Sequence, residues 1–238
     1  MKPFLTAQWR YLAMLNFEVD PAILASLVPT GTLLDDDAGR HYVSLIGFLF
    51  LDTHIFGLPA IFHENFEEVN LRFYVRRELA QQSRRGVVFI REIVSLPLVT
   101  EIAKLTYNEP YTTAPTKHSL VRTNDALQSV EYLLGSSPRQ CCLTLRVDGD
   151  AAPLESGSHE EFITERPWGF TRQRDGGTIE YAVDHPRWRI WGDSHAKLDG
   201  PVGDFFPQPF SSILTGAPAS AFVAEGSAVA VHLPQRIA

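Results

Sequence analysis

The segment from His63 to Glu78 has the pattern of a β-strand with two chemically different faces. Its apolar side chains recur at every second position, at Val69, Leu71, Phe73 and Val75. The alternate positions carry Glu68, Asn70, Arg72, Tyr74 and Arg76. Successive side chains of a strand point to opposite faces, so the apolar set predicts a face buried in a core. The polar set combines a carboxylate, an amide, a guanidinium and a phenol, which suits a pocket for an anionic or carbonyl-bearing small molecule.

Segments with strand-like composition continue through most of the chain. The predicted strands are 42–51, 66–77, 86–94, 118–122, 127–134, 140–147, 169–174, 178–183, 187–191, 221–223 and 228–233. Asp175-Gly176-Gly177 has the residues of a tight hairpin turn. The predicted helices are few and short: one opens at Asp20-Pro21, one runs from Pro97 to Lys104, and one follows a capping box of Ser158 and Glu161.

Many antiparallel strands with a few short helices predict a mainly β fold. We expect a large antiparallel β-barrel-like sheet with an interior polar cavity. No change of composition divides the 238 residues, so we expect a single domain covering residues 1–238. A chain of this length buries roughly three quarters of its unfolded surface, which is enough for one large core.

Composition argues against several classes of function. The formal net charge of −7 argues against a nucleic-acid partner, because phosphate binding needs a positive surface. The longest apolar run, Tyr42 to Leu51, is about half a membrane span, and the N-terminal segment lacks an apolar stretch of signal-peptide length. Cys141 and Cys142 are adjacent on a predicted strand, so a disulfide between them would be strained. We expect a soluble cytoplasmic protein with no membrane partner.

Known catalytic patterns are mostly missing from the sequence. There is no GxSxG nucleophile turn, no P-loop and no GxGxxG dinucleotide fingerprint. The histidines form no HxH or HExxH pattern, and the pair of Asp193 and His195 is more typical of a surface contact than of a metal site. We therefore predict no metal and no cofactor. A serine triad is not indicated, because no serine stands in a nucleophile turn.

Two other segments are candidates for lining a cavity. In 107–114, Pro110 fixes a bend from which Glu109 and Tyr111 would project into a barrel mouth. In 184–191, tryptophan alternates with arginine. This alternation either stacks guanidinium groups on indole rings or lines a cavity with cationic and aromatic surface, and the structural interpretation is favoured.

Several of these segments together resemble a known family. They are FEVDPAILASLVP, FEEVNLRFYVRRE, YNEPY, EEFITERPWGF, DHPRWRIW and FVAEGSAVAV. They are similar to the YqjF-like bacterial proteins, a conserved domain of unknown function that in turn resembles the acetoacetate decarboxylase superfamily. The resemblance covers nearly the whole chain, and the E-x-N-x-R-x-Y strand is its most specific element. It implies an acetoacetate decarboxylase-like fold around an enclosed polar cavity.

The resemblance also indicates which chemistry is lost. In acetoacetate decarboxylases a cavity lysine forms a Schiff base with the substrate ketone, and a second lysine beside it lowers its pKa. The corresponding place here is 109–112, Glu-Pro-Tyr-Thr, so both lysines are absent. Lys104 and Lys117 lie nearby in the sequence, and a solvated position is favoured for Lys104.

Other decarboxylase cavity residues have counterparts in the alignment that the resemblance implies. A strand arginine matches Arg10 and a glutamate matches Glu68, which predicts that Arg10 lies close to Glu68. A further cavity glutamate falls near Val43 or Ser44 and is lost.

Three hypotheses for the function follow. The first is a lyase-type or related enzyme acting on a small oxo-acid or carbonyl compound without a Schiff-base lysine. Its catalytic residues are Glu68, as general acid or base, and Tyr111, and its ligand-binding residues are Arg10, Asn70, Arg72 and Tyr74. The second is a non-catalytic binding protein that uses the same cavity. The third is a buried ion-pair network around Glu68 and Arg72 that holds the fold without any ligand. A homo-oligomer is compatible with each of them.

Overall fold

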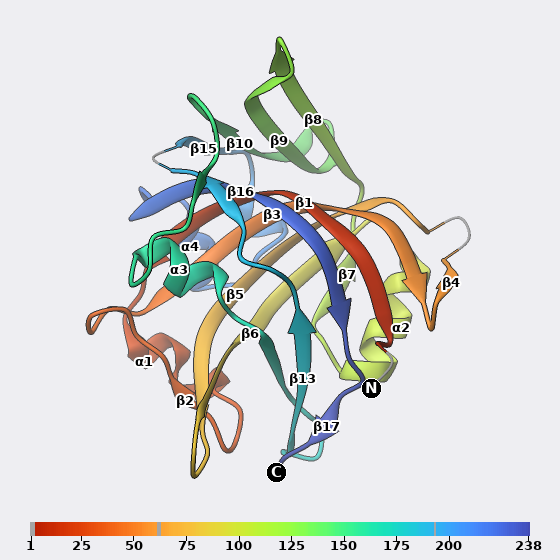
Figure 1. The fold of residues 1–238 in the computed structure, drawn as a ribbon, viewed down its shortest axis with the longest axis vertical. Helices are drawn as coiled ribbons and strands as arrows, with labels where there is room; N and C mark the ends of the chain where they lie inside the picture. The colour runs from red at the N-terminus through yellow and green to blue at the C-terminus, as the bar shows by residue number, and fades with distance from the viewer. Residues whose placement is uncertain (1–2, 61–62, 193) are drawn as a thin grey trace.

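The computed structural model describes residues 3–60, 63–192 and 194–238, and its centre is one large curved sheet (Figure 1). The strands of this sheet are β1 (Leu5–Glu18), β2 (Leu33–Leu34), β3 (Tyr42–Ile55), β4 (Leu58–Pro59), β5 (Phe66–Glu78), β6 (Ser83–Val94), β7 (Tyr111–Thr113), β11 (Ala152–Pro153), β12 (Trp168–Arg172), β13 (Thr178–Asp184), β14 (Arg189–Trp191), β16 (Ser220–Val231) and β17 (Gln235–Arg236). A smaller sheet contains β8 (Thr116–Thr123), β9 (Ala126–Ser136), β10 (Arg139–Arg146) and β15 (His195–Asp199). The helices are α1 (Pro21–Leu24), η1 (Ala25–Leu27), α2 (Pro97–Tyr107), α3 (His159–Thr164), η2 (Val202–Asp204) and α4 (Phe210–Leu214).

The long strands of the large sheet form a ring. They follow one another in the order β16-β1-β3-β5-β6-β12-β13, and β13 pairs again with β16 at Val183↔Val231. This last pairing joins the two ends, so the sheet encloses an interior as a barrel does. The predicted mainly β, barrel-like fold is confirmed. It departs from the all-antiparallel expectation where β12 and β7 each pair with β6 in parallel.

The two faces of β5 contribute to two different cores. Val69, Leu71, Phe73 and Val75 pack into the core shared with the smaller sheet, where they join residues of β9 and β10. Figure 1 shows this smaller sheet, drawn in green and cyan, beyond the convex side of the ring. The alternate residues of β5 point into the ring, where Glu68, Asn70 and Arg72 are buried. The strand therefore has the two-sided character that its alternation predicts.

Strand β1 was not among the predicted strands, because a bulge interrupts its alternation. The register between β1 and β3 shifts between Arg10 and Ala13, and Tyr11 has a φ of +53°. An inserted residue reverses which face the following side chains occupy, so a period-two pattern cannot be followed through it. Opposite this bulge, Gly226 of β16 has a φ of +80° and approaches the carbonyl oxygen of Trp9 too closely for a Cβ atom. This glycine lies inside one continuous strand, where two shorter strands were expected.

The predicted starts of the helices agree with the structure better than their predicted ends do. Asp20 caps α1 by accepting a hydrogen bond from the Ala22 amide, and Ser158 caps α3 by accepting one from the Glu161 amide. Helix α2 runs beyond Lys104 to Tyr107 and ends at a left-handed Asn108. Helix α4 was not predicted, and the strand expected over 187–191 is confined to β14.

Candidate active site inside the barrel

The interior of the ring contains a cavity of about 280 Å³, which is at the small end of the range for ligand pockets. Strands β1, β3, β5, β6, β12 and β13 contribute its sides, and α2 covers one end. Leu98 of α2 both lines the cavity and is 55% exposed, so the cavity reaches the surface beside this helix. Most of the lining is apolar, and its polar side chains include a group built around three buried carboxyl groups.

The first part of this group is a hydrogen-bonded pair, Glu68 and Tyr111. Tyr111 Oη donates to Glu68 Oε2 at 2.8 Å, and Asn70 Nδ2 donates to Glu68 Oε1 at 3.0 Å. Burial raises the pKa of Glu68 to about 7, against the opposing effect of these two donors and of the nearby Arg72 charge. Burial and the Glu68 charge raise the pKa of Tyr111 well above its ordinary value, so its hydroxyl keeps its proton. A carboxyl group with a pKa near neutrality can both accept and donate a proton.

Glu92 of β6 is a second buried carboxyl group in the cavity, and the sequence did not single it out. In the pairing of β5 with β6, Leu71 lies opposite Arg91, but the next residue, Arg72, lies opposite Phe89. Ile90 therefore has no partner on β5 and forms a bulge in β6. Without this bulge, strict alternation with Phe89 would turn Arg91 inward and Glu92 outward. Burial first, and then the charges of neighbouring glutamates, raise the pKa of Glu92 well above its ordinary value.

Glu109, at the bend between α2 and β7, is the third buried carboxyl group. Thr171 Oγ1 donates to Glu109 Oε1 at 2.5 Å, and Tyr181 Oη donates to the same oxygen at 2.9 Å. Burial raises the pKa of Glu109 to about 7, and the Glu68 charge acts in the same direction. The sequence indicated Glu109 only as part of a proline-fixed bend. Thr171 and Tyr181 were not indicated, because their segments have the pattern of ordinary core strands.

The carboxyl groups influence one another, because the Glu68 charge raises the pKa of both Glu92 and Glu109, and the Glu109 charge raises the pKa of Glu92. Three negative charges in one buried space are unfavourable, so the group holds protons at neutral pH. Several of its polar atoms have no hydrogen-bond partner among the described residues; they are Asn70 Oδ1, Glu92 Oε2 and Glu109 Oε2. Buried polar atoms are rarely left unpaired in folded proteins, so these atoms suit contact with a polar ligand.

Two of the residues predicted to bind ligand do not line the cavity. Arg10 donates hydrogen bonds to the Gly226 carbonyl at 3.4 Å and to Gln8 at 3.2 Å, and its neighbour Trp9 is the residue that faces the interior. Tyr74 is buried beyond the end of the cavity and hydrogen-bonds to Ser44. Arg10 and Tyr74 are therefore left out of the proposed site. Glu68, Asn70, Arg72 and Tyr111 remain in it.

No lysine lines the cavity within the described part of the chain. Lys104 lies on α2 and pairs with Glu101 at 3.3 Å, and Lys117 is exposed on β8. Tyr111, which takes the place where the resemblance puts a lysine, faces the interior instead.

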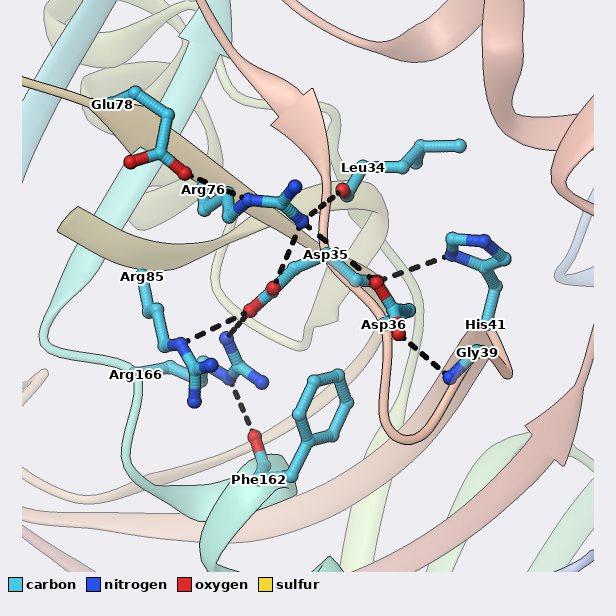
Figure 2. Close-up of polar contacts among 10 residues, drawn as sticks. All are labelled: Leu34, Asp35, Asp36, Gly39, His41, Arg76, Glu78, Arg85, Phe162 and Arg166. Atoms are coloured by element: carbon cyan, nitrogen blue, oxygen red, sulfur yellow. Dashed lines mark hydrogen bonds and ion pairs between the residues drawn. The ribbon is translucent and has the colours of Figure 1, made fainter. Parts of the chain in front are cut away.

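The ionic network of the third hypothesis lies elsewhere than predicted. Glu68 and Arg72 form no ion pair in the ranges that the structure covers. A network of ion pairs surrounds Asp35 instead, which receives contacts from Arg76, Arg85 and Arg166 (Figure 2).

No group of three or more His, Cys, Asp or Glu side chains able to hold a metal ion is found among the described residues. Asp193, half of the pair considered for a metal, lies outside those residues. No helix in the described ranges is long and apolar enough to cross a membrane.

One serine–histidine–aspartate arrangement does occur away from the cavity. His159 Nδ1 lies 2.7 Å from Asp37 Oδ2, and His159 Nε2 lies 2.8 Å from Ser220 Oγ. The Ser220 oxygen also accepts a hydrogen bond of 2.9 Å from Asn16 Nδ2. None of these residues lines the cavity, so the arrangement is best explained as a polar network that fastens α3 to β16.

The fold is similar to that of acetoacetate decarboxylase-like proteins. The structure matches an acetoacetate decarboxylase from Legionella pneumophila with a TM-score of 0.66 at 14% identity, over 100% of this chain and 88% of that one. It matches an acetoacetate decarboxylase-like enzyme from Sphingomonas wittichii RW1 with a TM-score of 0.69 at 13% identity, over 100% and 94%. It matches the enduracididine biosynthesis enzyme MppR complexed with pyruvate with a TM-score of 0.66 at 12% identity, over 100% of this chain and 92% of that one. At these identities the likeness shows the fold alone.

Residues 6–214 match the DUF2071 family, described as uncharacterized conserved protein, and the chain belongs to this family. The uncharacterized protein YqjF of Bacillus subtilis (strain 168) is 25% identical over 179 residues, which is 75% of this chain and 72% of that protein. The resemblance expected from the sequence is thereby confirmed.

Proposed function

We propose that the protein is an enzyme that transfers a proton next to the carbonyl group of a small molecule, with Glu68 as the base and without a lysine imine. The observation that carries the proposal is the hydrogen bond between Tyr111 and Glu68, set in a largely apolar cavity where burial raises the pKa of the carboxyl group to about 7. A base with a pKa near the working pH is the best compromise between ionisation and basicity.

The proposed step uses groups that all line the cavity. Ionised Glu68 takes a proton from the carbon beside the carbonyl, the C–H electron pair forms the enolate double bond, and the carbonyl electron pair moves to oxygen. Protonated Glu92 stabilises that oxygen by donating a hydrogen bond, while Tyr111 keeps its hydrogen bond to Glu68. The proton then returns to carbon or oxygen. The same groups can protonate an enolate left by carbon–carbon cleavage, so both lyase-type and isomerase-type reactions fit.

A non-catalytic binding protein is the alternative that the cavity also favours, because most of the lining is apolar and no lysine lies in it within the described residues. The two functions differ in one respect. A binding protein returns its ligand unchanged and without exchange of hydrogen atoms with water.

Exchange of hydrogen for deuterium beside a carbonyl therefore tests the proposal without knowledge of the final product. A panel of ketones, aldehydes and oxo-acids is incubated with protein in deuterium oxide and followed by proton NMR. We expect at least one compound to exchange faster than in buffer, and Glu68→Gln to slow that exchange by ~100-fold or more. Glu67→Gln is the matched control, because the Glu67 carboxylate binds Thr116 and His118 outside the cavity. Exchange that Glu68→Gln leaves unchanged would remove Glu68 from the chemistry.

Three further expectations remain proposals. We infer a single domain, a cytoplasmic location and a small anionic or carbonyl-bearing ligand as the main partner. Cys141 and Cys142 are free thiols, which supports a reducing compartment. A homo-oligomer is tested by light scattering coupled to size-exclusion chromatography.

A further inference from the structure

Arg72 is a buried guanidinium group with no carboxylate at ion-pair distance among the described residues. Its exposed fraction is 9%, and it takes part in no ion pair within the described ranges. Arg72 Nη2 donates to the Ile163 carbonyl at 3.0 Å, whereas Nε has no partner among the described residues. Burying a charge without pairing it is costly, so the position of Arg72 at the cavity is explained best by an anion that it binds.

Arg166 is a second guanidinium group at the same cavity, and the sequence did not single it out. Its side chain is only 1% exposed. Figure 2 shows how it is held: Nη1 donates to Asp35 Oδ2 at 2.5 Å and Nε donates to the Phe162 carbonyl at 2.5 Å. The remaining nitrogen, Nη2, has no partner among the described residues. Two of the three guanidinium nitrogens thus fix the group, and one is left for a ligand.

Asp35 does not cancel the charge of Arg166, because other arginines share it. Arg76 approaches Asp35 at 3.3 Å and Arg85 approaches it at 3.6 Å, and the described residues include no other ion pair of Arg85 (Figure 2). One carboxylate therefore faces three guanidinium groups, although Arg76 also pairs with Glu78 and approaches Asp36 at 3.9 Å. Among the described residues, Arg166 has no carboxylate beside it other than this shared Asp35.

Arg72 and Arg166 have a common neighbour in Tyr74. Both guanidinium carbons lie near the Tyr74 ring, at 5.7 and 5.0 Å from its centroid. Both side chains line the same cavity. Glu92 holds its proton, because burial and the neighbouring glutamate charges raise its pKa well above the ordinary value, so it does not cancel the attraction of the arginines for an anion.

The rest of the cavity suits an apolar body. Aromatic rings line the end near β1 and β3, where Trp9 packs edge-on against Phe48, Phe50 and Trp188 with ring centroids 5.3, 5.6 and 6.4 Å apart. At about 280 Å³ the cavity is at the small end of the range for ligand pockets, which suits a body of one aromatic ring or an apolar group of similar size.

We propose that Arg72 and Arg166 together form a carboxylate subsite, and that the ligand is a monocarboxylate with one aromatic ring or an apolar group of similar size. This inference rests on the proposed function because it concerns the same cavity, and it adds the class of substrate. A carbonyl on the side chain of such an acid would lie between the arginines and the aromatic end, where Glu68 lines the cavity.

The test uses acids that cannot undergo the proposed reaction, so that binding is measured apart from catalysis. Calorimetry compares 3-phenylpropanoate with its neutral isostere 3-phenylpropanamide and with propanoate, which lacks the ring. We expect 3-phenylpropanoate to bind at least ~10-fold more tightly than either, because charge-assisted hydrogen bonds and apolar burial both contribute. Equal binding of the amide would overturn the carboxylate subsite, and equal binding of propanoate would overturn the apolar body.

Variants locate the subsite. We expect Arg72→Gln and Arg166→Lys each to weaken binding of 3-phenylpropanoate by ~10-fold or more while leaving that of the amide nearly unchanged. Arg85→Gln is the matched control, because Arg85 contacts the same Asp35 without lining the cavity. If Arg166→Lys fails to fold, Arg72→Gln and the ligand series decide. Wild-type affinity in Arg72→Gln would overturn the assignment. Selective acid binding without any deuterium exchange would instead contradict the proposed function alone.

Discussion

Tyr111 donates a hydrogen bond of 2.8 Å to Glu68 although the two residues lie on strands that are not neighbours. Strand β7 pairs in parallel with β6 so that Tyr111 lies opposite Glu92, and β5 lies on the other side of β6. The hydroxyl therefore reaches across β6 to the Glu68 carboxyl. This places a proton donor, rather than an amine nucleophile, beside the buried base.

Removal of this hydrogen bond is expected to change the pKa of Glu68 in a defined direction. The bond stabilises the ionised carboxylate, so Tyr111→Phe should raise the pKa of Glu68 above about 7. The midpoint of the pH–rate profile for deuterium exchange then moves to higher pH, and the rate at pH 7 falls by ~10-fold or more. A profile that keeps its midpoint in Tyr111→Phe would show that the hydroxyl does not act on Glu68.

Borohydride trapping tests the absence of imine chemistry. Protein is mixed with the same panel of ketones and aldehydes, reduced with borohydride and weighed by mass spectrometry, with an acetoacetate decarboxylase as positive control. We expect the mass to stay unchanged, because no lysine lines the cavity in the described ranges. A stable adduct mapped to Lys104 or Lys117 would contradict this prediction, because it would mean that the modified lysine enters the cavity.

The buried carboxyl groups make stability depend on pH. The pKa of Glu109 is about 7 in the folded protein and 4.5 is its ordinary value, so between these pH values the folded state holds a proton that the unfolded state has lost. Stability contributed in this way is complete below pH 4.5 and is lost as the pH rises toward 7 and above. Glu109→Gln cannot ionise, so it should lose less stability between pH 5 and pH 8, by on the order of 3 kcal/mol in the free energy of unfolding.

Urea denaturation at the two pH values measures this difference. Glu101→Gln is the control, because Glu101 is exposed on α2 and pairs only with Lys104 among the described residues. Identical pH dependence in wild type and Glu109→Gln would mean that Glu109 is not held protonated by burial.

Gly169 is expected to be required for the position of Tyr181. A Cβ atom on Gly169 would overlap the phenol ring of Tyr181, which donates to Glu109. Gly169→Ala should displace that ring, lower the stability by ~1–3 kcal/mol and reduce turnover. Gly203→Ala, where no atom lies within 4 Å of the added carbon, should leave both unchanged. Thermal denaturation and the exchange assay check both variants, and wild-type behaviour of Gly169→Ala would contradict the packing account.

The sequence predicts the general fold because most of its strands keep a regular alternation. In β5 that alternation separates Val69 and Leu71, which pack outside the ring, from Glu68 and Asn70 inside it. In β1 and β6 the alternation is interrupted by bulges, and these are the places where prediction fails. The bulge at Tyr11 turns Trp9 inward in place of Arg10, and the bulge at Ile90 turns Glu92 inward.

Other parts of the site depend on contacts between distant segments. Arg166 reaches the cavity only because Asp35, which is 131 residues away, fixes its guanidinium group. Glu109 is buried because Thr171 and Tyr181 provide hydroxyl donors from β12 and β13. Such partners leave no local pattern, since each is set by the pairing of strands far apart in the chain.

The pH dependence of deuterium exchange tests the role of Glu68 most directly. For the panel compound that exchanges fastest, the rate is measured from pH 5 to pH 9 in wild type and in Glu68→Gln. We predict that the wild-type rate rises with pH to a plateau with a midpoint of about 7, the pKa of the buried carboxyl, and that Glu68→Gln shows no such rise. A rise with the same midpoint in Glu68→Gln would assign the base to another group and contradict the proposed mechanism.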